Sequence, residues 1–128
     1  MNSCLVDTDI IIDYLKGIEK SRLFLKRIEA KEIEAFYSAI TVAELFAGVR
    51  DGNEEKAVIN LLGLMKIVEI NFEISRLAGR LRFQYEKKNG IEIPDAIISA
   101  TSLCLKIPLV TRNVKHFKVI REMELFDY

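Results

Sequence analysis

The side chains best suited to chemistry in this chain are carboxylates placed where apolar runs end or where helices begin. Asp7 directly follows the apolar run 4–6, and Asp9 lies two residues further on. Glu44 and Asp95 each lie in the first turn of a predicted helix. A set of oxygen ligands suits Mg²⁺ or Mn²⁺ and argues against zinc. If the fold brings Asp7, Glu44 and Asp95 together, they would form a site for such a divalent cation.

The strands and helices that must position these groups alternate along the sequence. The run 4–6 is typical of a buried strand in a parallel sheet, and it leads straight into a helix. Further strands are predicted at residues 35–39, 67–70, 108–111 and 119–120. Helices are predicted at residues 8–16, 19–31, 41–49, 54–64, 72–88 and 93–105, with a polar loop at 112–118. This alternation predicts one α/β domain over residues 1–128, with a short, mainly parallel sheet of four or five strands flanked by helices.

A parallel sheet would gather the candidate residues at one edge. Strand ends and the helix starts that follow them share that edge, where ligands bind in open α/β sheets. Asp7 ends the first strand, Glu44 lies at the start of the helix after the second, and Asn113 closely follows the fourth. Asp95 reaches the same edge if its helix starts there, which the order of helix and then strand favours.

Each of these acids also has a purely structural interpretation. Thr41 and Glu44 have the spacing of a capping box. Asp95 suits the first turn of a helix, and Asp7 or Asp9 could cap the first helix. Three carboxylates at one edge would nevertheless repel one another, and at least one pKa would rise unless a cation lay between them. Taken together, the acids therefore favour metal binding over three unrelated caps.

The composition sets general limits on the function. The chain has 128 residues, of which 50% are hydrophobic, and this fits one globular domain with one core. Lys and Arg balance Asp and Glu at 19 each, so any nucleic-acid surface must be local. Cys4 and Cys104 lie in apolar runs and are expected to be buried, reduced thiols. With no signal peptide and no apolar run long enough to cross a bilayer, we expect a soluble cytoplasmic protein.

Four short motifs occur in order along the chain. They are Leu5-Val6-Asp7-Thr8-Asp9, Thr41-Val42-Ala43-Glu44-Leu45, Ile93-Pro94-Asp95-Ala96, and Leu109-Val110-Thr111-Arg112-Asn113 with Phe117. Each motif alone is weak, but the ordered set is specific and covers nearly the whole chain. Together the motifs resemble those of PIN-domain ribonucleases, and most closely those of the VapC-type toxins of prokaryotic toxin–antitoxin pairs.

The resemblance implies a three-layer PIN-like domain with Mg²⁺- or Mn²⁺-dependent endoribonuclease activity, the toxin of a type II toxin–antitoxin system. It also implies an RNA substrate and a homodimer that a small antitoxin protein holds inactive. Asp7, Glu44 and Asp95 match the acidic residues that hold the metal, and Thr111 matches a hydroxyl beside the site. Asn113 departs from the pattern, because the fourth acidic position is often Asp, and it leaves the number of metal ions open.

The residue types suit hydrolysis of a phosphodiester, which needs an attacking water and neutralised phosphoryl charge. Asp7 and Asp95 are expected to bind the metal directly, and Glu44 to bind it or to hold one of its waters. Three residues are expected to support the ligands or position water, namely Asp9, Thr111 and Asn113. Three basic residues could contact the RNA backbone or simply be solvated, namely Arg112, Lys115 and Lys118. His116, the only histidine, is expected to be a surface residue or a phosphate contact rather than a base.

Two other classes of function remain open at this point. A haloacid-dehalogenase-like phosphatase could use the Asp7-x-Asp9 spacing, with Asp7 as nucleophile. Its downstream Lys and acidic pair have no clear counterparts in this chain. The other class is a non-catalytic RNA- or protein-binding PIN relative, and the intact acids argue against it. No base-reading motif identifies an RNA target.

Overall fold

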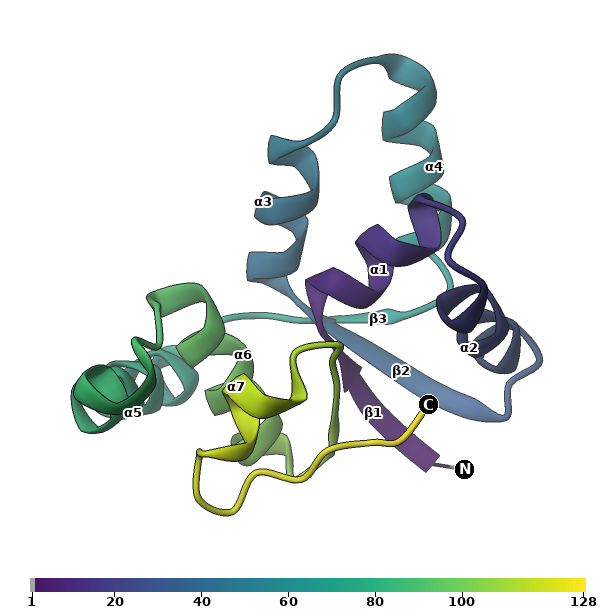
Figure 1. Ribbon diagram of the computed structural model, residues 1–128. Coiled ribbons are helices and arrows are strands. Elements are labelled where there is room, and N and C mark those ends of the chain that lie inside the picture. The colour runs from purple at the N-terminus through teal and green to yellow at the C-terminus, as the bar shows by residue number, and fades with distance from the viewer. Residues whose placement is uncertain (1) are drawn as a thin grey trace.

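The computed structural model describes residues 2–128, apart from the side chains of residues 86–89, and contains a four-stranded parallel sheet (Figure 1). The strands are β1 (Asn2–Val6), β2 (Ile33–Ser38), β3 (Lys66–Val68) and β4 (Leu109–Val110), in the order β3-β2-β1-β4. The first strand is central, and Leu5 pairs with Phe36 on one side and Leu109 on the other. The predicted α/β class with a short parallel sheet is confirmed.

Seven helices flank the sheet within the described residues. They are α1 (Thr8–Leu15), α2 (Glu19–Glu29), α3 (Ala39–Ala47), α4 (Gly52–Leu62), α5 (Phe72–Asn89), α6 (Ile93–Leu105) and α7 (Val114–Lys118). Figure 1 shows α5, α6 and α7 together on one side of the molecule, and α1 to α4 on the other. None of the helices in this part of the chain is both long and apolar enough to cross a membrane.

The apolar character of β1 explains why helices cover both faces of the sheet. Cys4 and Val6 belong to the core formed with α1 to α4, whereas Leu5 belongs to the core formed with α5, α6 and α7. Successive residues of a strand point to opposite faces, so the continuous apolar run 4–6 of β1 needs cover on both. The result is the expected three-layer arrangement, with the sheet between two groups of helices.

The helix that carries Glu44 begins earlier than predicted. Ser38 ends β2 and caps α3, and its Oγ accepts a hydrogen bond from the Ile40 amide at 3.2 Å. Thr41 therefore lies inside the helix, so the capping box considered for Thr41 and Glu44 is wrong. Glu44 lies in the second turn of α3, where its carboxylate has no capping function.

The segment after β4 differs most from the prediction. Residues 112–118, expected to be a loop, contain α7 because Phe117 is buried in the core, and the Asn113 carbonyl accepts the first N–H bonds of the helix. Residues 119–120, expected to be a strand, form a turn in which Ile120 is buried. A single parallel bridge between Leu109 and Leu125 lies beside β4 instead. The predicted fifth strand is therefore wrong in position and is reduced to one bridge.

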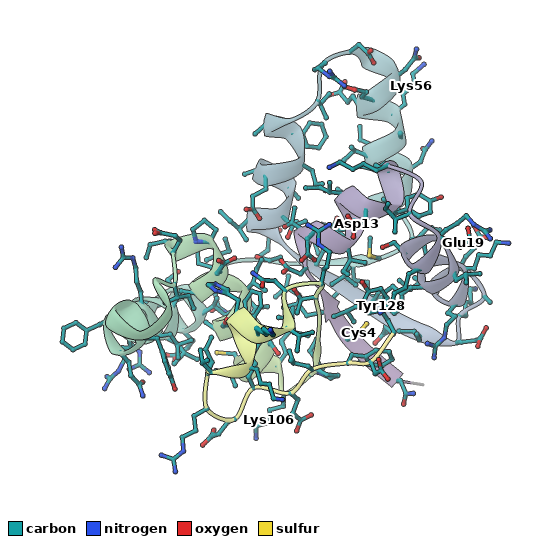
Figure 2. The ribbon with its side chains drawn as sticks, viewed as in Figure 1. Cys4, Asp13, Glu19, Lys56, Lys106 and Tyr128 are labelled. Atoms are coloured by element: carbon teal, nitrogen blue, oxygen red, sulfur yellow. The ribbon has the colours of Figure 1, made fainter. Side chains whose placement is uncertain are left out.

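The two cysteines have different environments. Cys4 lies on β1 in the core (Figure 2), and burial raises the pKa of its thiol to about 12. Cys104 is exposed near the end of α6, so its predicted burial is wrong. The middle of α6, residues 98–102, is buried, whereas Cys104 lies in the last turn of the helix, which is exposed.

Candidate active site

The carboxyl edge of the sheet contains a pocket of about 630 Å³. It is lined by the start of α1, the middle of α3, the start of α6 and the connection from β4 to α7. The lining residues are Asp7, Thr8, Asp9, Ile12, Glu44, Asp95, Arg112, Asn113 and Phe117. The structure thus brings the three expected metal ligands into one pocket, although they come from distant parts of the sequence.

Asp7 is the most buried acid of the pocket, with 6% of its surface exposed. It caps α1, because its Oδ1 accepts a hydrogen bond from the Thr8 amide at 2.8 Å. Its Oδ2 accepts one from the Thr111 hydroxyl, also at 2.8 Å. Burial, with further contributions from the charges of Asp9 and Asp95, raises the pKa of Asp7 to about 7. The cap predicted at Asp7 is present, but the carboxylate is also held among like charges that a cation would offset.

Glu44 is oriented by two threonines. The Thr8 hydroxyl donates a hydrogen bond to Glu44 Oε1 at 2.7 Å. The Thr8 hydroxyl oxygen also lies 2.9 Å from the Thr41 hydroxyl. Because the only hydroxyl proton of Thr8 is donated to Glu44, Thr41 is the donor in this second bond. Thr41 is fully buried, so this short chain of bonds ties the start of α1 to α3 and fixes the direction of the Glu44 carboxylate.

Asp9 fastens the β4–α7 connection to α1. Its carboxylate accepts the Arg112 amide at 3.1 Å and lies 3.3 Å from the Thr111 hydroxyl. Burial raises the pKa of Asp9, and the bond from the Arg112 amide partly opposes that rise. The Arg112 side chain donates from Nη1 to Asp13 Oδ1 at 2.6 Å. Figure 2 shows Asp13 on α1 at this edge of the molecule, and its side chain is only 6% exposed.

Asp95 lies in the first turn of α6 and contacts the helix that was not predicted. Its Oδ2 lies 3.0 Å from Nε2 of His116 on α7. The His116 side chain is 19% exposed and packs edge-on against the ring of Phe117. His116 is thus partly buried, and its imidazole is turned toward an acid of the pocket.

The remaining candidates divide into residues that line the pocket and residues that do not. Asn113 lines the pocket, and its side chain makes no capping bond to α7. Its backbone N–H donates to Thr111 Oγ1 at 3.0 Å. Arg112 also lines it, with the guanidinium engaged by Asp13. Lys115 and Lys118 are exposed on α7 and lie outside the lining.

The donor chemistry of the pocket fits a hard divalent cation. The potential ligands are oxygen atoms of Asp7, Glu44 and Asp95, with the amide of Asn113 nearby. Within the described side chains, no three acidic, histidine or cysteine groups already converge on one point. Mg²⁺ does not need such a cage, because it keeps several waters and binds one or two carboxylates together with substrate phosphate oxygens. The residues present are thus suited to Mg²⁺ or Mn²⁺.

Three supporting residues were missed from the sequence, namely Thr8, Asp13 and His116. Thr8 follows Asp7 directly, and its contact with Glu44 depends on how α1 and α3 pack, which local sequence does not reveal. Asp13 lies four residues after Asp9 on the same helix, and this spacing indicates that both acids lie on one face of α1. His116 could have been found only by recognising residues 114–118 as a helix.

Comparison with known proteins shows the family. The model of the PIN domain matches residues 4–122. Ribonuclease VapC19 of Mycobacterium tuberculosis is 30% identical over 121 residues, which span 94% of this chain and 96% of that protein. Ribonuclease VapC1 of Methanocaldococcus jannaschii is 33% identical over 126 residues, which span 97% of this chain and 85% of that protein.

Solved structures agree with this result. A toxin–antitoxin complex from Klebsiella pneumoniae contains a similar chain, with a TM-score of 0.77, 31% identity and 92% of both chains covered. VapBC2 from Rickettsia felis, bound to a DNA fragment from its promoter, has the same fold, with a TM-score of 0.83, 22% identity and 98% of both chains covered. The phosphatase alternative based on Asp7-x-Asp9 is therefore set aside. This chain belongs to the PIN-domain family, in the group of the VapC ribonucleases.

Proposed function

We propose that this protein is a Mg²⁺- or Mn²⁺-dependent endoribonuclease that acts as the toxin of a type II toxin–antitoxin pair. The observation that carries the proposal is the single pocket that Asp7, Glu44 and Asp95 line from three separate elements. Membership of the VapC ribonucleases supports hydrolysis of RNA as the reaction, and the pocket supplies residues suited to it.

In this proposal Asp7 and Asp95 bind the metal ion, and Glu44 binds it or orients the attacking water. A divalent cation at this place supplies charge neutralisation for the phosphate and makes a water more acidic. The Thr111 hydroxyl holds the Asp7 carboxylate, and the Thr8 hydroxyl holds that of Glu44. Both bonds restrict side chains that would otherwise move, so the ligands are oriented before the substrate arrives.

The connection from β4 to α7 is the proposed contact with the RNA backbone. Asn113 lines the pocket and offers an amide that can position a water or a phosphate oxygen. Arg112 brings a positive charge to the same wall while its bond to Asp13 limits its movement. Lys115 and Lys118 extend this positive charge along the exposed side of α7.

A small antitoxin is the proposed partner, because the structural neighbours come from toxin–antitoxin complexes. An apolar groove of about 390 Å³ lies between α1, α3 and α4. Ile12 and Glu44 line both this groove and the pocket, so a helix in the groove would reach the carboxylates. Figure 1 shows α3 and α4 projecting from the sheet as a pair, which leaves them accessible to a partner.

A homodimer is the proposed assembly. Phe72 and Phe83 on α5 are 75% and 83% exposed, and their spacing places them roughly three turns apart on one face of the helix. Exposed aromatic surface of this kind is typical of an interface, and a two-fold dimer would bury it on both copies. Light scattering should give twice the monomer mass, and a monomer at every working concentration would contradict this assembly.

Cleavage of a pool of RNA oligonucleotides, with Mn²⁺ and with EDTA, tests the function. Three substitutions should each nearly abolish cleavage, namely Asp7→Asn, Glu44→Gln and Asp95→Asn. The matched control is Asp51→Asn, because Asp51 caps α4, which contributes no residue to the pocket. Full activity in the three variants would refute the assigned site. Binding of RNA by the unaltered protein without any cleavage would instead favour a non-catalytic relative.

A further inference from the structure

The bond between His116 and Asp95 links α7 to the start of α6 beside the pocket. His116 Nε2 lies 3.0 Å from Asp95 Oδ2, which is a good hydrogen-bond distance. The two side chains are 19% and 36% exposed, so water only partly competes for this bond. The bond uses one of the two carboxylate oxygens of Asp95, whereas a metal ion needs only one oxygen from such a ligand.

The fold holds the imidazole in a defined place. Phe117, the next residue, is 1% exposed and anchors α7 in the core. Its ring meets the His116 ring edge-on, with the ring centres 5.2 Å apart and the planes at 86°. The backbone amide of His116 donates to the Asn113 carbonyl at 3.2 Å. Because its backbone and its ring are both restrained, His116 is a fixed partner for Asp95 rather than a mobile surface side chain.

The same arrangement recurs at all three proposed ligands, since each acid is hydrogen-bonded by a side chain from another element. The pairs are Thr111 with Asp7, Thr8 with Glu44, and His116 with Asp95. The first two pairs join elements that must pack together for the pocket to exist. The third pair joins α6 and α7 in the same way, so we infer that His116, like the two threonines, orients the acid that it contacts.

We propose that His116 is a positioning residue that orients the Asp95 carboxylate for metal binding. This inference rests on the metal-dependent function proposed above. The role requires only a proton on Nε2, which the neutral imidazole provides, and it does not require His116 to act as a base. Hydrogen-bond partners that orient metal ligands typically contribute about 10- to 100-fold to metal affinity.

Calorimetric titration of the whole protein with Mn²⁺, without RNA, tests this role. His116→Leu keeps apolar bulk beside Phe117 but removes the donor, and it should weaken Mn²⁺ binding about 10-fold or more. His116→Gln places an amide N–H at similar reach and should restore most of the affinity. In RNA cleavage, His116→Leu should raise the Mn²⁺ concentration needed for half activity, while kcat at saturating Mn²⁺ stays close to that of the unaltered protein.

The Asp95→Ala background, which removes both oxygens that His116 could orient, separates positioning from a general effect on the fold. Once the carboxylate is gone, His116→Leu should cause no further loss of Mn²⁺ affinity. Equal losses in the Leu and Gln variants, together with a lower melting temperature, would overturn the positioning role. Tighter Mn²⁺ binding by His116→Leu would also overturn it, because the imidazole would then compete with the metal.

The same titrations distinguish failure of this inference from failure of the proposed function. If Asp95→Asn binds Mn²⁺ as tightly as the unaltered protein, the metal site itself is wrongly assigned. If Asp95→Asn weakens binding and His116→Leu does not, the metal site stands and only the role of His116 is refuted.

Discussion

Replacing Asp7 by Asn should stabilise the metal-free protein, and more strongly at pH 8 than at pH 5. Asp7 is buried, and its pKa is raised to about 7, mainly by burial and then by the charge of Asp9. A raised carboxyl pKa means that the folded protein binds the proton more tightly than the unfolded chain does. The ionised group therefore opposes folding, and stability falls as pH rises from the unfolded pKa near 3.8 to the folded pKa near 7.

The size of the effect follows from the difference between the two pKa values. At about 1.4 kcal/mol for each pKa unit, the rise from 3.8 to about 7 makes ionised Asp7 unfavourable by roughly 4 kcal/mol at pH 8. At pH 5 the folded protein holds the proton, and the penalty is below about 2 kcal/mol. Asn can still accept the Thr8 amide, so the cap is retained. The free energy of unfolding of Asp7→Asn, relative to the unaltered protein, should therefore increase by about 2–3 kcal/mol from pH 5 to pH 8.

Urea unfolding in EDTA, followed by circular dichroism, measures this difference. Asp51→Asn is the matched control, because Asp51 also caps a helix but is exposed, and its effect should be small at both pH values. Saturating Mn²⁺ should reduce or reverse the advantage of Asp7→Asn at pH 8, because a ligand that binds only the folded state stabilises it. The reasoning is refuted if the difference does not change with pH, or if Asp7→Asn is the less stable protein at pH 8.

Three further predictions concern the residues around the carboxylates. Asn113→Asp should tighten Mn²⁺ binding through its added charge, and identical affinity and stoichiometry in calorimetry would place Asn113 outside the site. Thr8→Val removes the donor to Glu44 at nearly constant shape, so it should lower the free energy of unfolding by about 1–2 kcal/mol in urea and slow RNA cleavage, whereas Thr8→Ser keeps the donor and should not slow cleavage. Phe117→Ala should lower the free energy of unfolding by about 3–5 kcal/mol, because the side chain is 1% exposed, and should also raise the Mn²⁺ concentration needed for activity. Loss of stability without this change in the Mn²⁺ requirement would show that α7 does not support the site.

The meeting of the acids could be predicted because it depends on topology rather than on detail. Asp7 follows a strand whose last three residues are apolar, and such a strand belongs in the middle of a parallel sheet. Once β1 is central, the starts of α1 and α3 must lie at one edge. Asp95 arrives there because α6 returns to the opposite edge before β4 begins. Alternation of strands and helices was therefore sufficient to locate the pocket.

The bonds within the pocket could not be predicted, because they depend on packing between elements. Glu44 had a plausible local partner in Thr41, yet Ser38 caps the helix and Glu44 is bonded to Thr8 instead. Likewise α7 has only five residues and no side-chain cap, so little in its sequence indicates a helix. It forms because Phe117 is buried, which is a property of the assembled core.

The order of the strands has a consequence for synthesis of the protein. The first strand to leave the ribosome is one of the two internal strands of the sheet, and it stays unpaired on one side until β4 has been made. Asp7 and its partner Thr111 are separated by 104 positions in sequence, and contacts between distant positions form late and slowly. A nascent chain that ends before β4 lacks both the Thr111 hydroxyl that donates to Asp7 and the His116 side chain that contacts Asp95. Completion of the pocket is therefore among the last steps of folding, after the residues of α7 have emerged from the ribosome.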